Sequence, residues 1–448
     1  MIGTIETKDT YLADFARRER EAAGRAPAWL TALRQEAIAR FGELGFPTRH
    51  HEEWRFTNIA PLLEVPFHPA PAEPERLMLE RLRAFTFPGL DCCQLVFVNG
   101  RYAPELSTFG YLPEGVQVLS LAEALEAEPE AVGAHLARYA EFEQQAFTAL
   151  NTAFLEDGAF VSLPRGVIVE RPIHLLYVST APEKPTVSYP RTLFIAGENS
   201  QATLIESYAG WDGEVYFTNA VTEIVLGENA VVDHYKVLRE SLQAFHIADM
   251  RVHLERTSNF ASHSITLGGA LVRNEVYARL NGEGGECTLN GLYLANGRRL
   301  VDNHTAIDHA MPNCTSHEVY KGILDDRAHG VFNGKIFVRP DAQKTDAKQT
   351  NKTLLLSEDA QINTKPQLEI FADDVRCTHG ATVGQLDEDA LFYMRSRGIG
   401  EEQARNILTF AFASEIISRI KVEPVRAQLE QALFEQLPGG HETEELLK

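Results

Sequence analysis

The sequence is poor in cysteine, with five in 448 residues: Cys92, Cys93, Cys287, Cys314 and Cys377. Five is too few for a disulfide framework in a chain of this length, and no paired CxxC units suggest a zinc ribbon. Neighbouring residues on a strand point to opposite faces, so Cys92 and Cys93 are expected to pack rather than to form a redox pair. We therefore expect all five thiols to be reduced.

The sequence also lacks positive charge and long apolar runs. It has 42 Lys and Arg against 63 Asp and Glu, a net charge of −21, and no run of five or more basic residues. Nucleic acid is therefore not an expected partner. No uncharged apolar run reaches membrane-spanning length, and the opening residues, MIGTIETKDT, lack the apolar core of a secretory signal. These features predict a cytoplasmic protein without membrane contact.

The motifs of the common enzyme classes are missing. The nearest candidate for a phosphate-binding loop, GVFNGKI at 330–336, has three residues between its glycines and Ile336 where a Ser or Thr would hold Mg²⁺. No GxGxxG follows an expected strand, and HExxH and GxSxG are absent. We therefore do not expect this chain to hydrolyse ATP by itself, or to act as a nucleotide-dependent oxidoreductase, zinc protease or serine hydrolase.

Apolar residues at helical spacing predict helices at both ends of the chain. Residues 8–45 are expected to form two helices, and helical spacing returns in 119–154. Near the end of the chain, Asp387 is expected to cap a helix, and two more helices are expected at 401–420 and 425–437. The sequence thus predicts helical segments on both sides of a different central region.

Residues 159–386 consist of short β-branched and aromatic runs broken by tight polar turns, and 92–100 is a further short strand ending in Asn-Gly. The turns resemble one another at irregular intervals of a few tens of residues, which favours a β-solenoid over the alternative, a large β-sandwich. We expect three domains: 1–158, mostly helical with a short strand; 159–386, the β-solenoid core; and 387–448, helical. The turn segments are GENSQATLIESY at 197, GENAVVDHYKV at 227, RTSNFASHSIT at 256, GEGGECTLNGLY at 282, DDRAHGVFNGKI at 325, SEDAQINTKPQ at 357 and DDVRCTHGATV at 373.

Three segments resemble the SufB/SufD family of the bacterial SUF machinery for iron-sulfur cluster assembly. They are CTHGATVGQLDEDALFYMRSRG at 377–398, the segment 297–370, and GFPTRHHEEWRFT at 45–57. The SufB branch typically has His-Glu-Ala where this chain has His379-Gly380-Ala381, and a CxxC-containing motif nearer its N-terminus is also missing here. The resemblance is therefore to the SufD branch, and a SufB-type paralogue is the alternative.

The resemblance implies a mostly β protein, with a right-handed parallel β-helix core flanked by N-terminal and C-terminal helical domains. It also implies a non-catalytic scaffold that pairs with a SufB-like subunit through the β-helix and docks a SufC-like ATPase through its C-terminal helices. No cofactor is expected to stay bound to this chain alone. A transient iron-sulfur cluster is expected in the complex, where reduced flavin is a further candidate. Exposed end strands would also allow a homodimer when the partner is missing.

Cys377 and His379 are the candidate metal-binding residues. They are one residue apart on an expected strand, so their side chains share a face and could contact one iron or sulfur atom. Two ligands are fewer than the four that iron-sulfur clusters usually take from protein, so a partner must complete the site. The family resemblance implies this role for His379 in particular, while Cys377 is expected to be either a ligand or a packing residue.

A second group, His304, His309, Cys314 and His317, has spacings of five, five and three that fit no familiar metal-ligand pattern. We interpret these residues as parts of turns and rungs. The remaining alternative for the whole chain is a stand-alone β-helix enzyme acting on a carbohydrate or acyl substrate, which requires a groove lined by clustered carboxylates or histidines. Aromatic residues of the C-terminal helices, from Phe392 to Phe434, are expected either to pack in the core or to form the ATPase dock.

Overall fold

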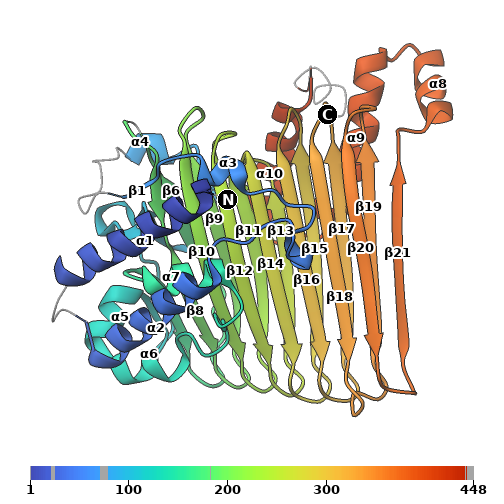
Figure 1. The fold of residues 1–448 in the computed structure, drawn as a ribbon. Coiled ribbons are helices and arrows are strands. Elements are labelled where there is room, and N and C mark those ends of the chain that lie inside the picture. Colours follow the sequence, from blue (N-terminus) through green and yellow to red (C-terminus); the bar gives the residue numbers. More distant parts are fainter. Residues whose placement is uncertain (1, 22–25, 71–78, 182, 439, 441–448) are drawn as a thin grey trace.

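The computed structural model describes residues 2–21, 26–70, 79–181, 183–438 and 440. Its dominant feature is a stack of parallel strands in two sheets, drawn from green to orange in Figure 1. The principal strands are β5 Gly158–Leu163, β6 Ile173–Ser179, β8 Arg191–Ala196, β9 Gln201–Gly210, β10 Tyr216–Leu226, β11 Val231–Arg239, β12 Phe245–Leu254, β13 Asn259–Thr266, β14 Leu271–Leu280, β15 Glu286–Ala295, β16 Leu300–His309, β17 Thr315–Leu324, β18 His329–Val338, β19 Asp346–Leu355, β20 Gln361–Ile370 and β21 Arg376–Gly384.

Strands that follow one another in the sequence lie in opposite sheets. From β8 onward, sheet A holds the even-numbered strands up to β20, and sheet B holds the odd-numbered strands up to β21. Each strand pairs in parallel with the strand two places later, as β17 does with β19, so one strand from each sheet forms one rung. The fold is therefore a parallel β-helix, which confirms the solenoid prediction, and the β-sandwich alternative is wrong.

The recurring polar turns are the corners of the rungs. Asn199, Asn229 and Asn313 occupy corresponding corners with φ near 60° (58°, 58° and 61°), a left-handed conformation that asparagine tolerates better than most residues. Between corners, alternate residues point inward, and the inward side chains stack from rung to rung as one core. The turn pattern in the sequence thus marks the repeat of the β-helix.

Shorter elements close the N-terminal end of the stack. The expected strand at 92–100 is confirmed as β2 Cys93–Val98, which extends sheet B by pairing in parallel with β6. Two antiparallel strands then end the sheets: β3 Arg101–Tyr102 pairs with β2, and β4 Gln117–Ser120 pairs with β5. The remaining short elements are β1 His68–Pro69, β7 Thr186–Ser188 and the 3-10 turns η1 Glu52–Trp54 and η2 Pro104–Leu106.

N-terminal helices cover the outer face of sheet A (Figure 1). Aromatic rings form much of this contact, with Phe147 packed between Trp54 and Phe217. The short helix α4 Leu79–Leu82 packs instead on sheet B, where Leu82 joins a cluster with Val96 and Val98 of β2. The helices on sheet A are α1 Ile2–Glu21, α2 Ala28–Leu44, α3 Ala60–Leu63, α5 Leu121–Ala127, α6 Pro129–His135 and α7 Ala146–Ala153. They confirm the helical spacing expected in 8–45 and 119–154.

A buried carboxylate fastens the N-terminal region to sheet A. Glu223 on β10 accepts a 2.5 Å ion-pair contact from Arg191 on β8, and both side chains are fully buried. The backbone N–H groups of Ala137, Tyr139 and Ala140 also donate to Glu223, at 2.9, 2.9 and 3.1 Å. One side chain therefore satisfies a buried cation and three backbone donors.

Two C-terminal helices, α9 Glu401–Ile417 and α10 Glu423–Gln436, cover the outer face of sheet B. They follow α8 Glu388–Ser396, which Asp387 caps as expected. Ile416 and Leu433 pack against sheet residues such as Ile323, and Lys321 on β17 donates to the Phe412 carbonyl at 2.9 Å. Both outer faces are thus clad by helices. Among the described helices, none is both long and apolar enough to cross a membrane.

Candidate functional site

The C-terminal end of the β-helix is uncovered. At the right-hand edge of Figure 1, β21 stands as the last strand of sheet B, while β20 ends sheet A. Every residue of β21 is exposed except the half-buried Cys377, and β20 is half-buried along most of its length. No further rung covers these strands. The side chains that point into the β-helix and the backbone groups along the strand edge are therefore accessible at this end.

Cys377 and His379 both lie on β21, on the face that looks into the β-helix. Their register partners on β19 are Ala347 and Gln349, which are 0% and 2% exposed and belong to the interior. In-register residues of parallel strands share a face, so the two candidate side chains stand side by side at the open end. Among the described residues, no third His, Cys, Asp or Glu joins them to form a metal-sized group.

The thiol of Cys377 belongs to a small apolar cluster. It packs with Leu368 and Val375 against buried residues that include Ile336 and Ala347. Burial raises the pKa of this thiol above its usual value, with a smaller contribution from the charge of Asp346. The thiol is therefore protonated at neutral pH, and binding of a metal there requires its deprotonation.

Polar side chains continue into the interior behind His379. Gln349 on β19 and Glu318 on β17 occupy the same register position in the two preceding rungs. The Gln349 amide Nε2 donates to Glu318 Oε2 at 2.7 Å, and both side chains are almost completely buried. Sequence analysis did not single out these two residues, because only the rung register places them behind His379.

Burial raises the pKa of Glu318 to about 7, although the neighbouring Thr305 hydroxyl and the Gln349 amide act to lower it. A carboxyl whose pKa is higher in the folded than in the unfolded chain stabilises the fold fully at low pH, and this stabilisation is lost as pH rises through the folded pKa. Replacing Glu318 by Gln removes this pH dependence.

We therefore expect Glu318→Gln to gain stability relative to the wild type as pH rises from about 4.5 to about 7, by up to about 1.4 kcal/mol per pH unit. Urea unfolding of both proteins at several pH values measures this difference. A difference that stays constant across the window would contradict the buried, proton-binding state of Glu318.

The second histidine group is dispersed by the fold, as expected. His304, on the outer face of sheet A, contacts Asp302 at 3.0 Å and Glu53 at 3.3 Å. Facing carboxylates raise the pKa of His304, chiefly Asp302, although burial opposes them. The other members are separate: His309 contacts the Ser316 hydroxyl at 2.8 Å, Cys314 lies against the Gly282 carbonyl, and His317 is exposed.

The carboxylates near His304 hold the N-terminal segment, and two of them, Glu53 and Glu275, also line a pocket of about 190 Å³ together with His304. Arg273 is fully buried, pairs with Asp302 and with Glu275 (2.6 Å), and stacks 3.8 Å from the ring centre of Trp54. The hydroxyl of Thr57 donates to Asp302 at 2.5 Å. The segment 45–57, one of the three that carry the family resemblance, is thus fixed across sheet A.

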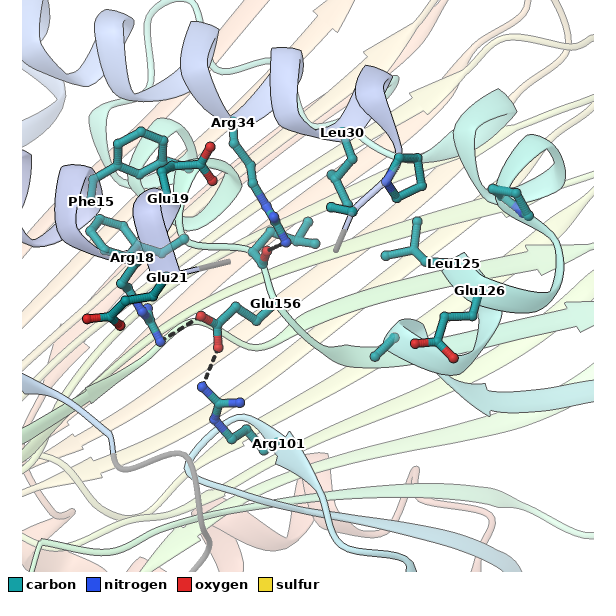
Figure 2. Close-up of a pocket in the computed structure, with 17 residues that line it drawn as sticks. Phe15, Arg18, Glu19, Glu21, Leu30, Arg34, Arg101, Leu125, Glu126 and Glu156 are labelled. Carbon is teal, nitrogen blue, oxygen red and sulfur yellow. Dashed lines mark hydrogen bonds and ion pairs between the residues drawn. The ribbon is translucent and has the colours of Figure 1, made fainter. Parts of the chain in front are cut away.

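A cavity of about 640 Å³ lies among the N-terminal helices (Figure 2). It is lined by residues of α1, α2 and α5, helices that lie at the end of the β-helix away from β21 (Figure 1). Figure 2 shows Arg18 and Arg101 converging on Glu156, at 2.8 and 2.5 Å. Arg34 reaches the Leu155 carbonyl from α2. These contacts pair the cationic groups of the cavity within the fold, and none of its lining residues belongs to β20 or β21.

Helix α8 projects beyond β21 (Figure 1), and it has no buried residue. Phe392 and Tyr393 on this helix are 75% and 59% exposed. The other C-terminal aromatics are packing residues: Phe410 stacks on Phe434 with ring centres 4.2 Å apart, and Phe412 lies under the ammonium of Lys321. The structure thus separates these aromatic residues into an exposed pair on α8 and packed rings on α9 and α10.

Comparisons with known proteins cover nearly the whole chain. The profile described as SUF system FeS cluster assembly, SufBD core domain matches residues 177–412, and that of the SufBD protein N-terminal region matches residues 5–175. A SufBD family iron-sulfur cluster assembly protein of Synechocystis is 34% identical, over 90% of each chain. The iron-sulfur cluster assembly protein SufD of Escherichia coli is 33% identical over 91% of this chain and 93% of its own. SufD of Bacillus subtilis is 26% identical over 96% and 98%.

Proposed function

Because this chain belongs to the SufBD family, whose members assemble iron-sulfur clusters in the SUF system, we propose that it is a non-catalytic scaffold subunit that acts only within a complex. It pairs with a SufB-like subunit at the open end of the β-helix and docks a SufC-like ATPase through its C-terminal helices. The observation that carries this proposal is the uncovered terminal rung, which bears Cys377 and His379 beside free backbone groups.

The backbone of β21 supports strand pairing with a partner. In a parallel sheet, successive N–H groups point alternately to the two sides of a strand. Arg376 donates its N–H to Thr345 at the β19 side, which leaves the N–H groups of the odd residues 377–383 on the open edge. A partner strand added there gains an unbroken row of donors and acceptors.

The open edge of β20 is less suitable. Gln361 and Phe371 donate their N–H groups toward β18, so the even-numbered residues between them face the open side. Pro366 is one of these residues and has no N–H, which interrupts the row of donors at the middle of the strand. The partner strand is therefore proposed to pair with β21 rather than with β20.

We expect Ala381→Pro to weaken binding of the SufB-like subunit at least about ten-fold, because it removes an outward N–H at the centre of the β21 edge. Ala381→Ser keeps the N–H and serves as the matched control. Titration calorimetry with the purified partner measures both. Equal affinity of the proline variant and the control would place the interface elsewhere.

His379 and Cys377 are proposed as half of a transient cluster site, with the partner supplying the remaining ligands. Imidazole and thiolate both suit iron, and an incomplete set holds the cluster less tightly than four protein ligands, so release remains feasible. No cofactor is proposed to stay on this chain alone, and reduced flavin, if used, is proposed to act at the level of the complex. The iron-sulfur cluster is proposed to be assembled and released rather than kept as a cofactor.

We expect His379→Ala to fold and to join the complex like the wild type, because the side chain is exposed, but to reduce cluster loading of the reconstituted complex about ten-fold or more. Anaerobic iron and sulfide analysis with visible absorption measures the loading. Thr378→Ala, exposed on the same strand, is the control. Loading of the His379 variant equal to that of the control would remove His379 from the site.

A further inference from the structure

One buried amide lies directly behind the proposed cluster ligand. Gln349 on β19 is the register partner of His379 on β21, and it is 2% exposed. Neighbouring parallel strands lie about 4.8 Å apart, so side chains at paired positions on the same face are in reach of each other. Glu318, Gln349 and His379 are register partners on successive rungs, and Gln349 is the interior polar side chain next to the His379 imidazole.

The two ends of the Gln349 amide have different environments. Its Nε2 donates to Glu318 Oε2 at 2.7 Å, on the side of the preceding rung. Its Oε1 is buried and has no hydrogen-bond partner among the described residues. With its nitrogen donating to Glu318, the amide is left with an unpaired carbonyl oxygen in the interior.

The opposite wall of the β-helix holds this amide in place. Gly334 on β18 lies so close that a Cβ built on it would be 2.3 Å from Gln349 Nε2. A side chain at position 334 would displace the amide from this place, so Gln349 lies between Glu318 on one side and Gly334 across the interior. A confined amide with one free acceptor can orient a neighbouring donor.

We propose that Gln349 is a positioning residue for His379: its free Oε1 accepts a hydrogen bond from one ring N–H and thereby turns the other ring nitrogen toward the open end. Neutral imidazole has one donor and one acceptor nitrogen, and the hydrogen bond made by the donor decides which nitrogen is available to a metal. Gln349 selects the tautomer, and Glu318 keeps Gln349 in the orientation that does so. This inference rests on the proposed role of His379 but makes a separate statement about its ring.

The test is the tautomer of His379, measured by nitrogen NMR of the full-length protein with ¹⁵N-labelled histidine, with the signal assigned by its loss in His379→Gln. In the wild type one neutral tautomer should dominate. Gln349→Met keeps the length of the side chain without an acceptor, so the ratio of the two tautomers should fall at least about five-fold. Asn351→Leu is the matched control, because Asn351 is a buried amide on the same strand whose register partner is Ala381.

A second variant protects the test against a folding defect. Gly334→Ala leaves Gln349, Glu318 and His379 unchanged but displaces the amide, so the tautomer ratio should fall as in Gln349→Met. An unchanged ratio in whichever of these two variants folds, judged by circular dichroism, overturns the proposal. Cluster loading separates this proposal from the proposed function: if His379→Ala lowers loading while Gln349→Met and Gly334→Ala keep the wild-type tautomer, only the positioning role fails.

The converse result is equally informative. If Gln349→Met changes the tautomer ratio and His379→Ala leaves loading intact, Gln349 does orient the ring, and the ligand role of His379 fails instead. If both hold, Gln349→Met should also slow cluster loading of the complex by about ten-fold, the usual size of effect for a group that orients a metal ligand. Loading at the wild-type rate despite an altered tautomer would show that the tautomer has no bearing on the cluster.

Discussion

The double variant Phe392→Ala/Tyr393→Ala should lose binding of the SufC-like ATPase by at least about 100-fold while its β-helix remains folded. Both rings are exposed on α8, a helix that buries none of its own side chains and projects beyond the last rung. Aromatic residues that act as hot spots of an interface contribute about 2 kcal/mol or more each to binding, and we expect these two rings to be such residues. Titration of the ATPase onto the purified variant measures the loss.

The chain provides a closely matched control. Phe109 and Tyr111 are likewise a Phe and a Tyr close together in the sequence, and they are 53% and 77% exposed. They lie near β2 in the N-terminal part of the fold. Phe109→Ala/Tyr111→Ala should bind the ATPase like the wild type. Wild-type affinity in the α8 double variant would place the dock elsewhere.

Deletion of all residues after Leu386 is also expected to abolish ATPase binding. The structure shows why this deletion is the less specific experiment: it removes α9 and α10 and uncovers apolar residues of sheet B such as Ile323 and Leu292. Loss of binding by that truncation could therefore follow from aggregation. The α8 double variant leaves this contact intact.

The largest expected effect on stability is that of Glu223→Ala. This substitution leaves the buried Arg191 without its carboxylate and three backbone N–H groups in 137–140 without an acceptor. Removing one partner of a buried ion pair costs about 3–5 kcal/mol, because the other charge stays buried and unpaired. Urea unfolding followed by circular dichroism measures the change in the free energy of unfolding.

Two further variants serve as controls for the Glu223→Ala prediction. Glu43→Ala breaks an exposed pair with Arg40 and should change the free energy of unfolding by less than about 1 kcal/mol. Arg191→Met/Glu223→Ala removes the buried charge as well and should recover part of the loss, while the three N–H groups remain unpaired. A Glu223→Ala effect no larger than that of Glu43→Ala would contradict the anchoring role.

Local chemistry in the sequence was sufficient to predict the main helices and the repeating strands, but not the short elements α3, α4, β3 and β4, and β4 includes residues 119–120, where helical spacing was expected. Asn199 and Asn229 lie in turn segments that resemble each other, and both turned out to be left-handed corners of successive rungs. Asp387 was predicted as a helix cap because a short acidic side chain before a helix can accept from its first N–H groups, and it does so. Such features depend on a few neighbouring residues only.

The contacts around the candidate site could not be predicted in the same way. Glu318, Gln349 and His379 are 31 and 30 residues apart in the sequence, and they share a column only because the intervening loops have particular lengths. A change of one residue in a loop would move each side chain to the other face of its strand. The exposure of Phe392 also depends on how α8 leaves the β-helix, which its amphipathic pattern does not specify.

The two ends of the strand stack are unequal, and this limits how copies can associate. The last strand, β21, offers a nine-residue edge, whereas the first edges belong to β3 and β4, which have two and four residues and run antiparallel to their neighbours. Head-to-tail polymerisation needs two complementary long edges on each molecule. Because the long edges, those of β20 and β21, lie at the same end of the stack, a tail-to-tail pair uses them up and cannot grow further, so the assembly stays finite even at high concentration.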